Sequence, residues 1–288
     1  TRKHFYFICY YKKPNYNNKY MLKQAVDFKN ESDYLHDILA DLSEADLETK
    51  TFFKEWTFNT IIRHLHVWNY AAKIALSNIR EWEKFSKTLT ENFNNRKSLN
   101  YFEKNFSNNL KGKKLLENWK SLYVDITDNF KIADPKRRVN WIGPDMSVIS
   151  SISARHMETW AHGQAIFDAL GIWRKNEDRI LNIVIMGNNT FNWSYKVNKL
   201  DIPKQTPYLK LTSPSGKIWE FNDKKNINYI EGMAEDFCQV VTQVRNIQDV
   251  KLTVKGSIAE EWMSIAQCFA GQAQTPPKPG TRKINLSM

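Results

Sequence analysis

The sequence predicts an α+β protein of two domains, a four-helix bundle followed by a smaller domain of helices and strands. In the first 175 residues, four long segments carry apolar residues at helical spacing. After Trp173 the pattern changes to short alternating strands around a turn. With 288 residues, of which 42% are hydrophobic, the chain is long enough for each domain to bury its own core.

These patterns divide the chain into four parts. Residues 1–20, which include KKPNYNNKY, are expected to form a disordered leader. Residues 21–175 form the expected bundle, and residues 176–272 form the expected C-terminal domain. Residues 273–288 are rich in proline, and we expect them to be a disordered tail.

Each bundle helix is predicted from its own pattern. The first covers residues 22–42, and the second begins after Thr57, a residue type that caps helix N-termini. The third covers KKLLENWKSLYVDITDNF, residues 113–130. The fourth runs from about Ser147 to Leu170, where the next residue is a glycine suited to end a helix. Four such helices with short to medium loops favour an antiparallel bundle.

The C-terminal domain is predicted to combine a hairpin, helices and a further strand. Residues 206–223 alternate around Ser-Pro-Ser-Gly and predict a hairpin. Residues 232–246 and 257–271 predict helices, and residues 250–256 predict a strand. ILNIVIMG, residues 180–187, is ambiguous, because its β-branched residues favour a strand while its length and neighbours permit a helix.

Composition narrows the classes of function. The net charge of +11 raises the question of nucleic-acid binding, but the excess is spread along the chain and favours solvated surface. No apolar run approaches the roughly 20 residues of a membrane span, so no membrane partner is expected. The three cysteines form no C-x-x-C pair, which predicts neither a disulfide framework nor a thiolate zinc site and is typical of a reducing cytoplasm.

The segment RHMETWAHGQ, residues 155–164, suggests a metal site. Glu158 and His162 are four residues apart, so on a helix they share one face. Zinc and similar metals take imidazole and carboxylate ligands, and helix bundles often build such sites from facing helices. Among the six histidines, His64 is the best third ligand, since it falls on the apolar stripe of the second helix. The alternative is a surface ion pair between Glu158 and Arg155.

Three segments carry a resemblance to a known family: EWTFNTIIRHLHVWNYAA, VNWIGPDMSVISSISARHMETWAHGQAIFDALG, and AEDFCQVVTQVRN with EEWMSIAQCFAG. Together they resemble the DinB-like, mycothiol-dependent maleylpyruvate isomerase superfamily, and METWAHGQ is most similar to a branch of uncharacterised metal-binding proteins. The resemblance runs from about Met21 to Gly271. It implies a bundle that holds a divalent metal on His64, Glu158 and His162. It also implies a sterol-carrier-like α/β domain at the C-terminus.

The resemblance has further implications and two departures. It favours a helix for residues 180–187. The family usually has an acid three residues after the second histidine, where this chain has Ala165, and that acid would tune or orient the metal site. An arginine-rich stretch of the family is reduced here to Gln243, Val244 and Arg245.

In relatives, the metal activates a low-molecular-weight thiol such as mycothiol, which adds to an electrophilic substrate. The resemblance therefore implies a thiol-dependent isomerase or S-transferase whose partners are a small molecule and a thiol. No cysteine lies near the ligands in the sequence, so the thiol is expected to come from outside. Arg245 is the candidate anchor for a substrate carboxylate, and Trp141 and Trp160 are candidate pocket walls. Their alternatives are a solvated arginine and two core tryptophans.

Two other functions remain open. AEDFCQVVTQV also resembles a domain named for wyosine-base formation, which suggests a tRNA-modifying or RNA-binding protein. However, the sequence has neither a radical-type C-x-x-x-C-x-x-C cluster nor an aromatic-basic RNA motif. The second alternative is a metal-binding protein without catalysis, because this chain has Ala165 where the family has an acid. Zinc is the preferred metal, and a homo-oligomer is compatible with every reading.

Overall fold

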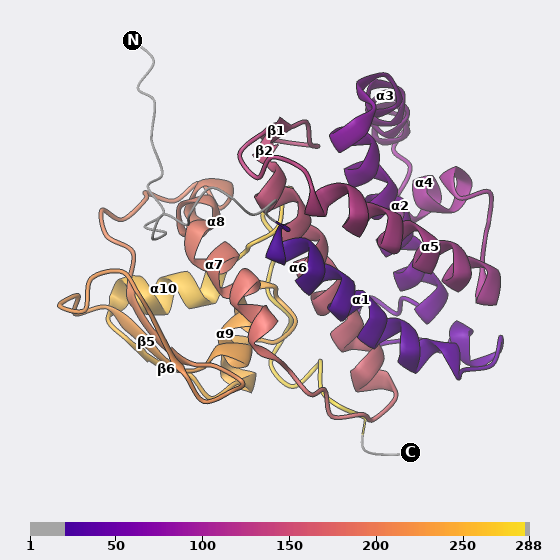
Figure 1. The fold of residues 1–288 in the computed structure, drawn as a ribbon. Helices are drawn as coiled ribbons and strands as arrows, with labels where there is room; N and C mark the ends of the chain where they lie inside the picture. Colours follow the sequence, from indigo (N-terminus) through magenta and orange to yellow (C-terminus); the bar gives the residue numbers. More distant parts are fainter. Residues whose placement is uncertain (1–20, 286–288) are drawn as a thin grey trace, which may run out of the picture.

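The computed structural model describes residues 21–285, which fold into an N-terminal helical bundle and a smaller α/β domain beside it (Figure 1). This arrangement confirms the predicted fold class. The expected leader, residues 1–20, lies outside the described residues. Within the described part of the chain, no helix is long and apolar enough to cross a membrane.

Four long helices form the bundle: α1 (Lys23–Ala40), α2 (Phe58–Ser77), α5 (Gly112–Lys131) and α6 (Val148–Ala169). Both α1 and α2 pack against α5 and α6. The cap predicted at Thr57 is present, since its side chain accepts a hydrogen bond from the backbone of Thr60. Ser147 caps α6 in the same way. These four helices match the predicted segments to within about two residues at most ends.

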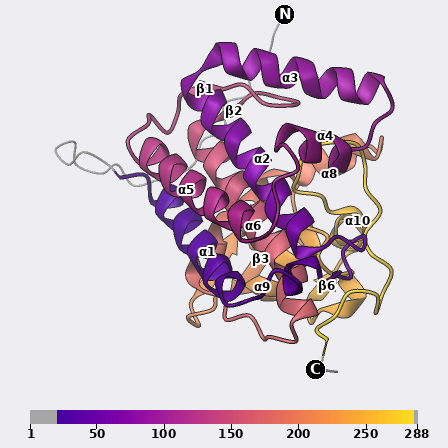
Figure 2. The same ribbon diagram turned by 90° about the vertical axis from the view of Figure 1, so that its right-hand side faces the viewer.

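Shorter elements complete the bundle. The 3-10 turn η1 (Asp46–Glu48) follows α1, and α3 (Ile79–Asn94) and α4 (Leu99–Phe106) lie between α2 and α5 in the sequence. A small hairpin of β1 (Arg138–Val139) and β2 (Met146–Ser147) leads into α6. Figure 2 shows α3 crossing one end of the bundle and α4 beside α2, which it contacts.

The C-terminal domain contains a four-stranded sheet in the order β4-β3-β5-β6. Its strands are β3 (Tyr208–Thr212), β4 (Ile218–Phe221), β5 (Tyr229–Met233) and β6 (Thr253–Lys255). The predicted hairpin is β3 and β4, which pair antiparallel, whereas β3 and β5 are parallel. The helical elements of this domain are η2 (Asp178–Ile180), α7 (Leu181–Asn189), α8 (Phe191–Val197), α9 (Ala234–Val241), η3 (Ile247–Asp249) and α10 (Ser257–Ile265). Buried residues of the sheet and helices share one core.

The ambiguous segment at residues 180–187 is largely helical, because it contributes most of α7. The strand favoured by its β-branched residues is wrong, and the helix implied by the family resemblance is confirmed. Ile183 and Val184 are fully buried, so they serve packing between helices rather than a sheet. Gly187 permits this packing, because a Cβ there would come within 2.8 Å of Val241 on α9.

The C-terminal tail differs from the expected disorder over residues 273–285. Residues 272–285, here named the C-terminal strap, run between the bundle and the C-terminal domain (yellow in Figure 1). The strap contains no regular helix or strand, yet hydrogen bonds tie it to both sides. They join Gln274 and Arg282 to Gln243, Pro277 to Asn246, Gly280 to Asp249, and Asn285 to Asp168.

A buried ion cluster joins the two domains. Glu31 on α1 accepts hydrogen bonds from Arg174 and, at 2.6 Å, from Nε of Arg179. His156 of α6 lies 3.8 Å from the same carboxylate. Glu31 is 1% exposed. The first residues after the bundle are therefore held against α1, which fixes where the C-terminal domain begins.

Candidate metal centre

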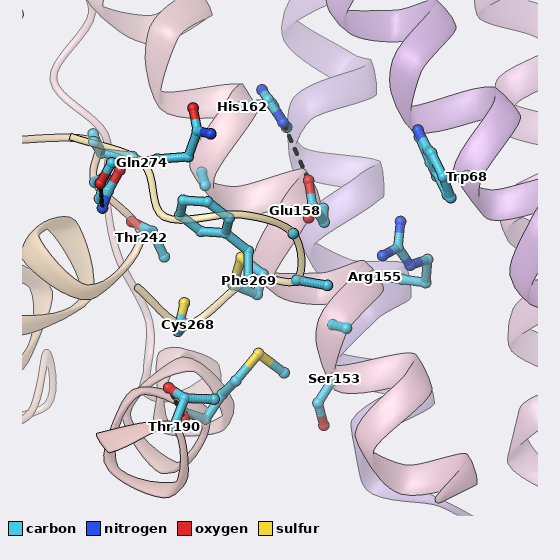
Figure 3. Close-up of a pocket in the computed structure, with 18 of the residues that line it drawn as sticks. Trp68, Ser153, Arg155, Glu158, His162, Thr190, Thr242, Cys268, Phe269 and Gln274 are labelled. Carbon is cyan, nitrogen blue, oxygen red and sulfur yellow. Dashed lines mark hydrogen bonds and ion pairs between the residues drawn. The ribbon is translucent and has the colours of Figure 1, made fainter. Parts of the chain in front are cut away.

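The three predicted ligands lie together in the core of the bundle. Oε2 of Glu158 is 3.1 Å from Nε2 of His162 and 3.4 Å from Nε2 of His64. One ligand atom from each of the three side chains lies within 4.8 Å of the others. Figure 3 shows His162 and Glu158 pointing toward each other from α6. The geometry therefore permits one ion to contact all three side chains.

Helix periodicity explains this convergence. Glu158 and His162 are one turn apart on α6, and α2 packs against α6 with His64 facing it. His66, two residues further along α2, has no part in the cluster. The alternative of a surface ion pair between Glu158 and Arg155 does not describe the structure, because Arg155 is only 4% exposed and its guanidinium lies over the ring of Trp141 at 4.9 Å.

Aromatic rings enclose the histidines. The ring of Trp56 stacks parallel to His162 at 5.7 Å, and Phe53 meets the same imidazole edge to face at 5.0 Å. Trp68 lies 6.2 Å from His64. These rings leave the imidazoles little freedom to rotate, so the nitrogen atoms stay aimed at Glu158.

Glu103 is a residue of the site that the sequence patterns missed. Its Oε1 is 2.7 Å from Nδ1 of His64, and the indole of Trp68 donates to the same oxygen at 2.9 Å. Glu103 lies on the short helix α4, 39 residues from His64, and is 1% exposed. A carboxylate on Nδ1 holds the proton there and leaves Nε2 free to bind a metal, as in other carboxylate–histidine–metal arrangements.

Electrostatics of the cluster fit a cation. Burial would by itself lower the pKa of His64, but the carboxylates of Glu103 and Glu158 raise it to about 9. Burial works in the opposite direction on Glu158, yet its hydrogen bonds with His162 and His64 hold the pKa of Glu158 well below its usual range. Two buried carboxylates thus call for positive charge here, which a divalent ion on His64, Glu158 and His162 would also provide.

A large cavity of about 1550 Å³ reaches the cluster from between the two domains. Trp141 lines it as predicted, and packs 5.7 Å from Trp68. Trp160 does not line it: the side chain is fully buried and its indole donates to Asn176. The sequence placed Trp160 near the ligands by its position between them, but it points to the other side of α6, into the core of the C-terminal domain.

Arg245 lies in the cavity wall but is not free. Its Nη2 is 2.7 Å from Oδ1 of Asp168, which also accepts a hydrogen bond from Gln164. The guanidinium is therefore neither the solvated group nor the unpaired anchor considered from the sequence. Ala165, the position of the missing acid, also lines the cavity, one turn before Asp168.

The structure brings a cysteine to the cavity that the sequence did not place there. Cys268 lines the cavity and lies near Phe269 (Figure 3). Burial, together with the negative charge of Glu158, raises the pKa of the Cys268 thiol. This shift favours the neutral thiol over the thiolate, which is the nucleophilic form.

Comparisons with known proteins agree with this geometry. Residues 28–167 match the family model described as the mycothiol maleylpyruvate isomerase N-terminal domain, and this range contains all three candidate ligands. Two proteins of Mycobacterium tuberculosis strains, both named uncharacterised, are each 31% identical over 259 residues, covering 89% of this chain and 97% of theirs.

Two solved structures are also similar, at lower identity. A mutant of the mycothiol-dependent maleylpyruvate isomerase is 13% identical, with a TM-score of 0.48, and covers 76% of this chain and 87% of its own. A second structure of that isomerase has 12% identity and a TM-score of 0.47, with the same coverage. On the family match and the full-length mycobacterial relatives, the chain belongs to the mycothiol-dependent maleylpyruvate isomerase superfamily.

Proposed function

We propose that this protein is a divalent-metal-dependent enzyme of the cytoplasm that uses a low-molecular-weight thiol, such as mycothiol, either to isomerise a small electrophilic substrate or, as an S-transferase, to join the thiol sulfur to it. The observation that carries the proposal is the convergence of His64, Glu158 and His162 in the wall of a large cavity. A bound divalent metal would lower the pKa of a coordinating thiol and so supply a nucleophile at neutral pH.

The surrounding residues have defined tasks in this proposal. His64, Glu158 and His162 hold the ion, and three protein ligands leave a coordination position open, as catalytic zinc sites do. Glu103 keeps Nε2 of His64 available, and the rings of Trp56 and Phe53 shield His162 from water. Two imidazoles and one carboxylate form a ligand set that catalytic zinc sites use, and zinc is the metal we prefer for this site.

The cavity has room for two ligands at once. Its volume of about 1550 Å³ exceeds the upper end, roughly 1,000 Å³, of pockets that hold one drug-sized molecule. A thiol and its electrophile must both reach the metal centre for a reaction. A cavity of this volume therefore fits a two-substrate enzyme better than a protein that only binds a metal ion. An external thiol is thus the preferred second component.

The test compares thiol binding in matched histidine variants. We expect zinc-loaded wild type to bind mycothiol and the chelator-treated protein not to bind it. His64→Ala should abolish this binding, whereas His66→Ala, which changes a histidine outside the cluster, should preserve it. Equal thiol binding with and without metal would contradict the proposal.

Measurements of turnover and of tRNA binding distinguish an enzyme from a non-catalytic metal-binding protein and from an RNA-binding protein. If wild type binds metal and thiol but does not turn over a maleylpyruvate-like electrophile, Ala165 marks a non-catalytic relative. An RNA-binding protein would instead retain tRNA with steep salt dependence, unaffected by His64→Ala.

A further inference from the structure

The C-terminal strap and the loop before α2 bring two cations to the edge of the candidate metal centre. The guanidinium of Arg282 lies over the ring of Phe53 at 4.8 Å, and Nζ of Lys54 lies over the same ring at 5.4 Å. Phe53 in turn meets His162 edge to face at 5.0 Å. Both cations line the cavity, so they are one aromatic ring away from a predicted metal ligand.

Neither cation is neutralised by a carboxylate. Among residues 21–285, no ion pair involves Lys54 or Arg282, whereas the nearby Arg245 is paired with Asp168 at 2.7 Å. Arg282 donates instead to the backbone oxygen of Gln243 at 2.6 Å. That neutral contact and the Phe53 ring orient the guanidinium without cancelling its charge.

The three cations influence one another. Burial and the charge of Arg245 lower the pKa of Arg282, against a smaller opposing effect of Asp168. Burial and Arg282 likewise lower the pKa of Lys54. Asp168 is paired with Arg245, so Arg282 and Lys54 leave a surplus of positive charge on this part of the cavity wall.

We propose that Arg282, assisted by Lys54, forms an anion subsite that holds a carboxylate of the substrate beside the metal centre. Arg282 keeps N–H donors beyond the one committed to Gln243, and a guanidinium can present two of them to one carboxylate. Arg245 is a positioning residue, because its bond to Asp168 occupies it and braces the wall. The C-terminal strap is therefore a specificity-determining part of the site.

This inference rests on the proposed function, because the subsite serves the same cavity. Its test uses maleate, a small dicarboxylate, as the probe, measured by calorimetry on zinc-loaded and chelator-treated protein. We expect Arg282→Gln to weaken maleate binding about tenfold, as for loss of one charge-assisted hydrogen bond. Lys283→Gln removes an equal charge from the neighbouring, exposed position of the strap and should leave the affinity unchanged.

The outcomes separate this proposal from the metal hypothesis. The subsite is supported if Arg282→Gln loses maleate affinity and Lys283→Gln does not. We expect this difference in zinc-loaded and in chelator-treated protein. Equal affinity in both variants, no binding by wild type, or tighter binding of inorganic phosphate than of maleate would overturn it. Zinc content measured on the same samples reports the metal site independently. Arg282→Lys keeps the positive charge but lacks the paired N–H donors of a guanidinium, so it should bind maleate with intermediate affinity. This variant tests the subsite if Arg282→Gln does not fold.

Discussion

At the residue scale, the candidate site depends on a side chain with no motif of its own. Glu103 contacts Nδ1 of His64 at 2.7 Å from a different helix. We expect Glu103→Gln to lower zinc affinity by about 10- to 100-fold, the usual cost of losing a carboxylate that is hydrogen-bonded to a metal-binding histidine. The neutral amide no longer makes the imidazole of His64 a stronger metal ligand. Competition against a chromophoric chelator measures this. Lys104→Gln, at the exposed neighbouring position, should bind zinc like wild type, and equal affinity in both variants would contradict the role of Glu103.

Single residues also show what the sequence could predict. His64, Glu158 and His162 follow from helical spacing and an apolar stripe, both of which are local. Glu103 and Arg282 reach the site only through the packing of α4 and the C-terminal strap, so no local pattern indicates them. Trp160 was misplaced because a helix buried on several sides gives no clue to which side faces the cavity.

At the scale of elements, the ion cluster of Glu31 fastens α1 to the segment that leads into α7. Burial alone would raise the pKa of Glu31, but Arg174, His156 and Arg179 hold it well below its usual range. Glu31→Gln should therefore lower the free energy of unfolding at pH 7 by about 3–5 kcal/mol, since it leaves buried cations unpaired. Urea denaturation measures this, with the exposed Asp41→Asn as the control.

The same cluster makes a prediction about pH. A carboxylate with a depressed pKa in the folded state stabilises the fold above its unfolded pKa, near 4.5 for Glu31, and this stabilisation is lost as the pH falls below that value. The difference in unfolding free energy between wild type and Glu31→Gln should thus be largest at pH 7 and should decrease as the pH falls below about 4.5. A constant difference from pH 7 to the acid range would contradict this assignment.

The four long helices of the bundle were predictable because each carries a long apolar stripe, and α2 and α6 also begin at a capping side chain. The elements that were missed or misjudged are short or depend on distant contacts. The strand β5, which pairs in parallel with β3, was not predicted, and its last two residues were assigned to the helix expected over residues 232–246. The C-terminal strap looked disordered because its hydrogen bonds go to α6 and to residues 243–249 after α9, which are distant in sequence.

At the scale of the whole molecule, a metal that binds only the folded state should stabilise it. Zinc at about 100 times its dissociation constant is expected to add about 2.7 kcal/mol to the free energy of unfolding. For a chain of this size, the melting temperature should rise by a few degrees. Calorimetry of wild type with and without zinc measures the shift, and His162→Ala should show none. An equal rise in both proteins would place the metal elsewhere.

The most direct test of the metal centre is elemental analysis of purified wild type beside Glu158→Ala. Glu158 contacts both histidines, so its loss removes the group that the other two ligands share. We predict one divalent metal ion per chain in wild type and a small fraction of that in Glu158→Ala. Wild type that contains no stoichiometric metal, even after incubation with zinc, would contradict the central claim.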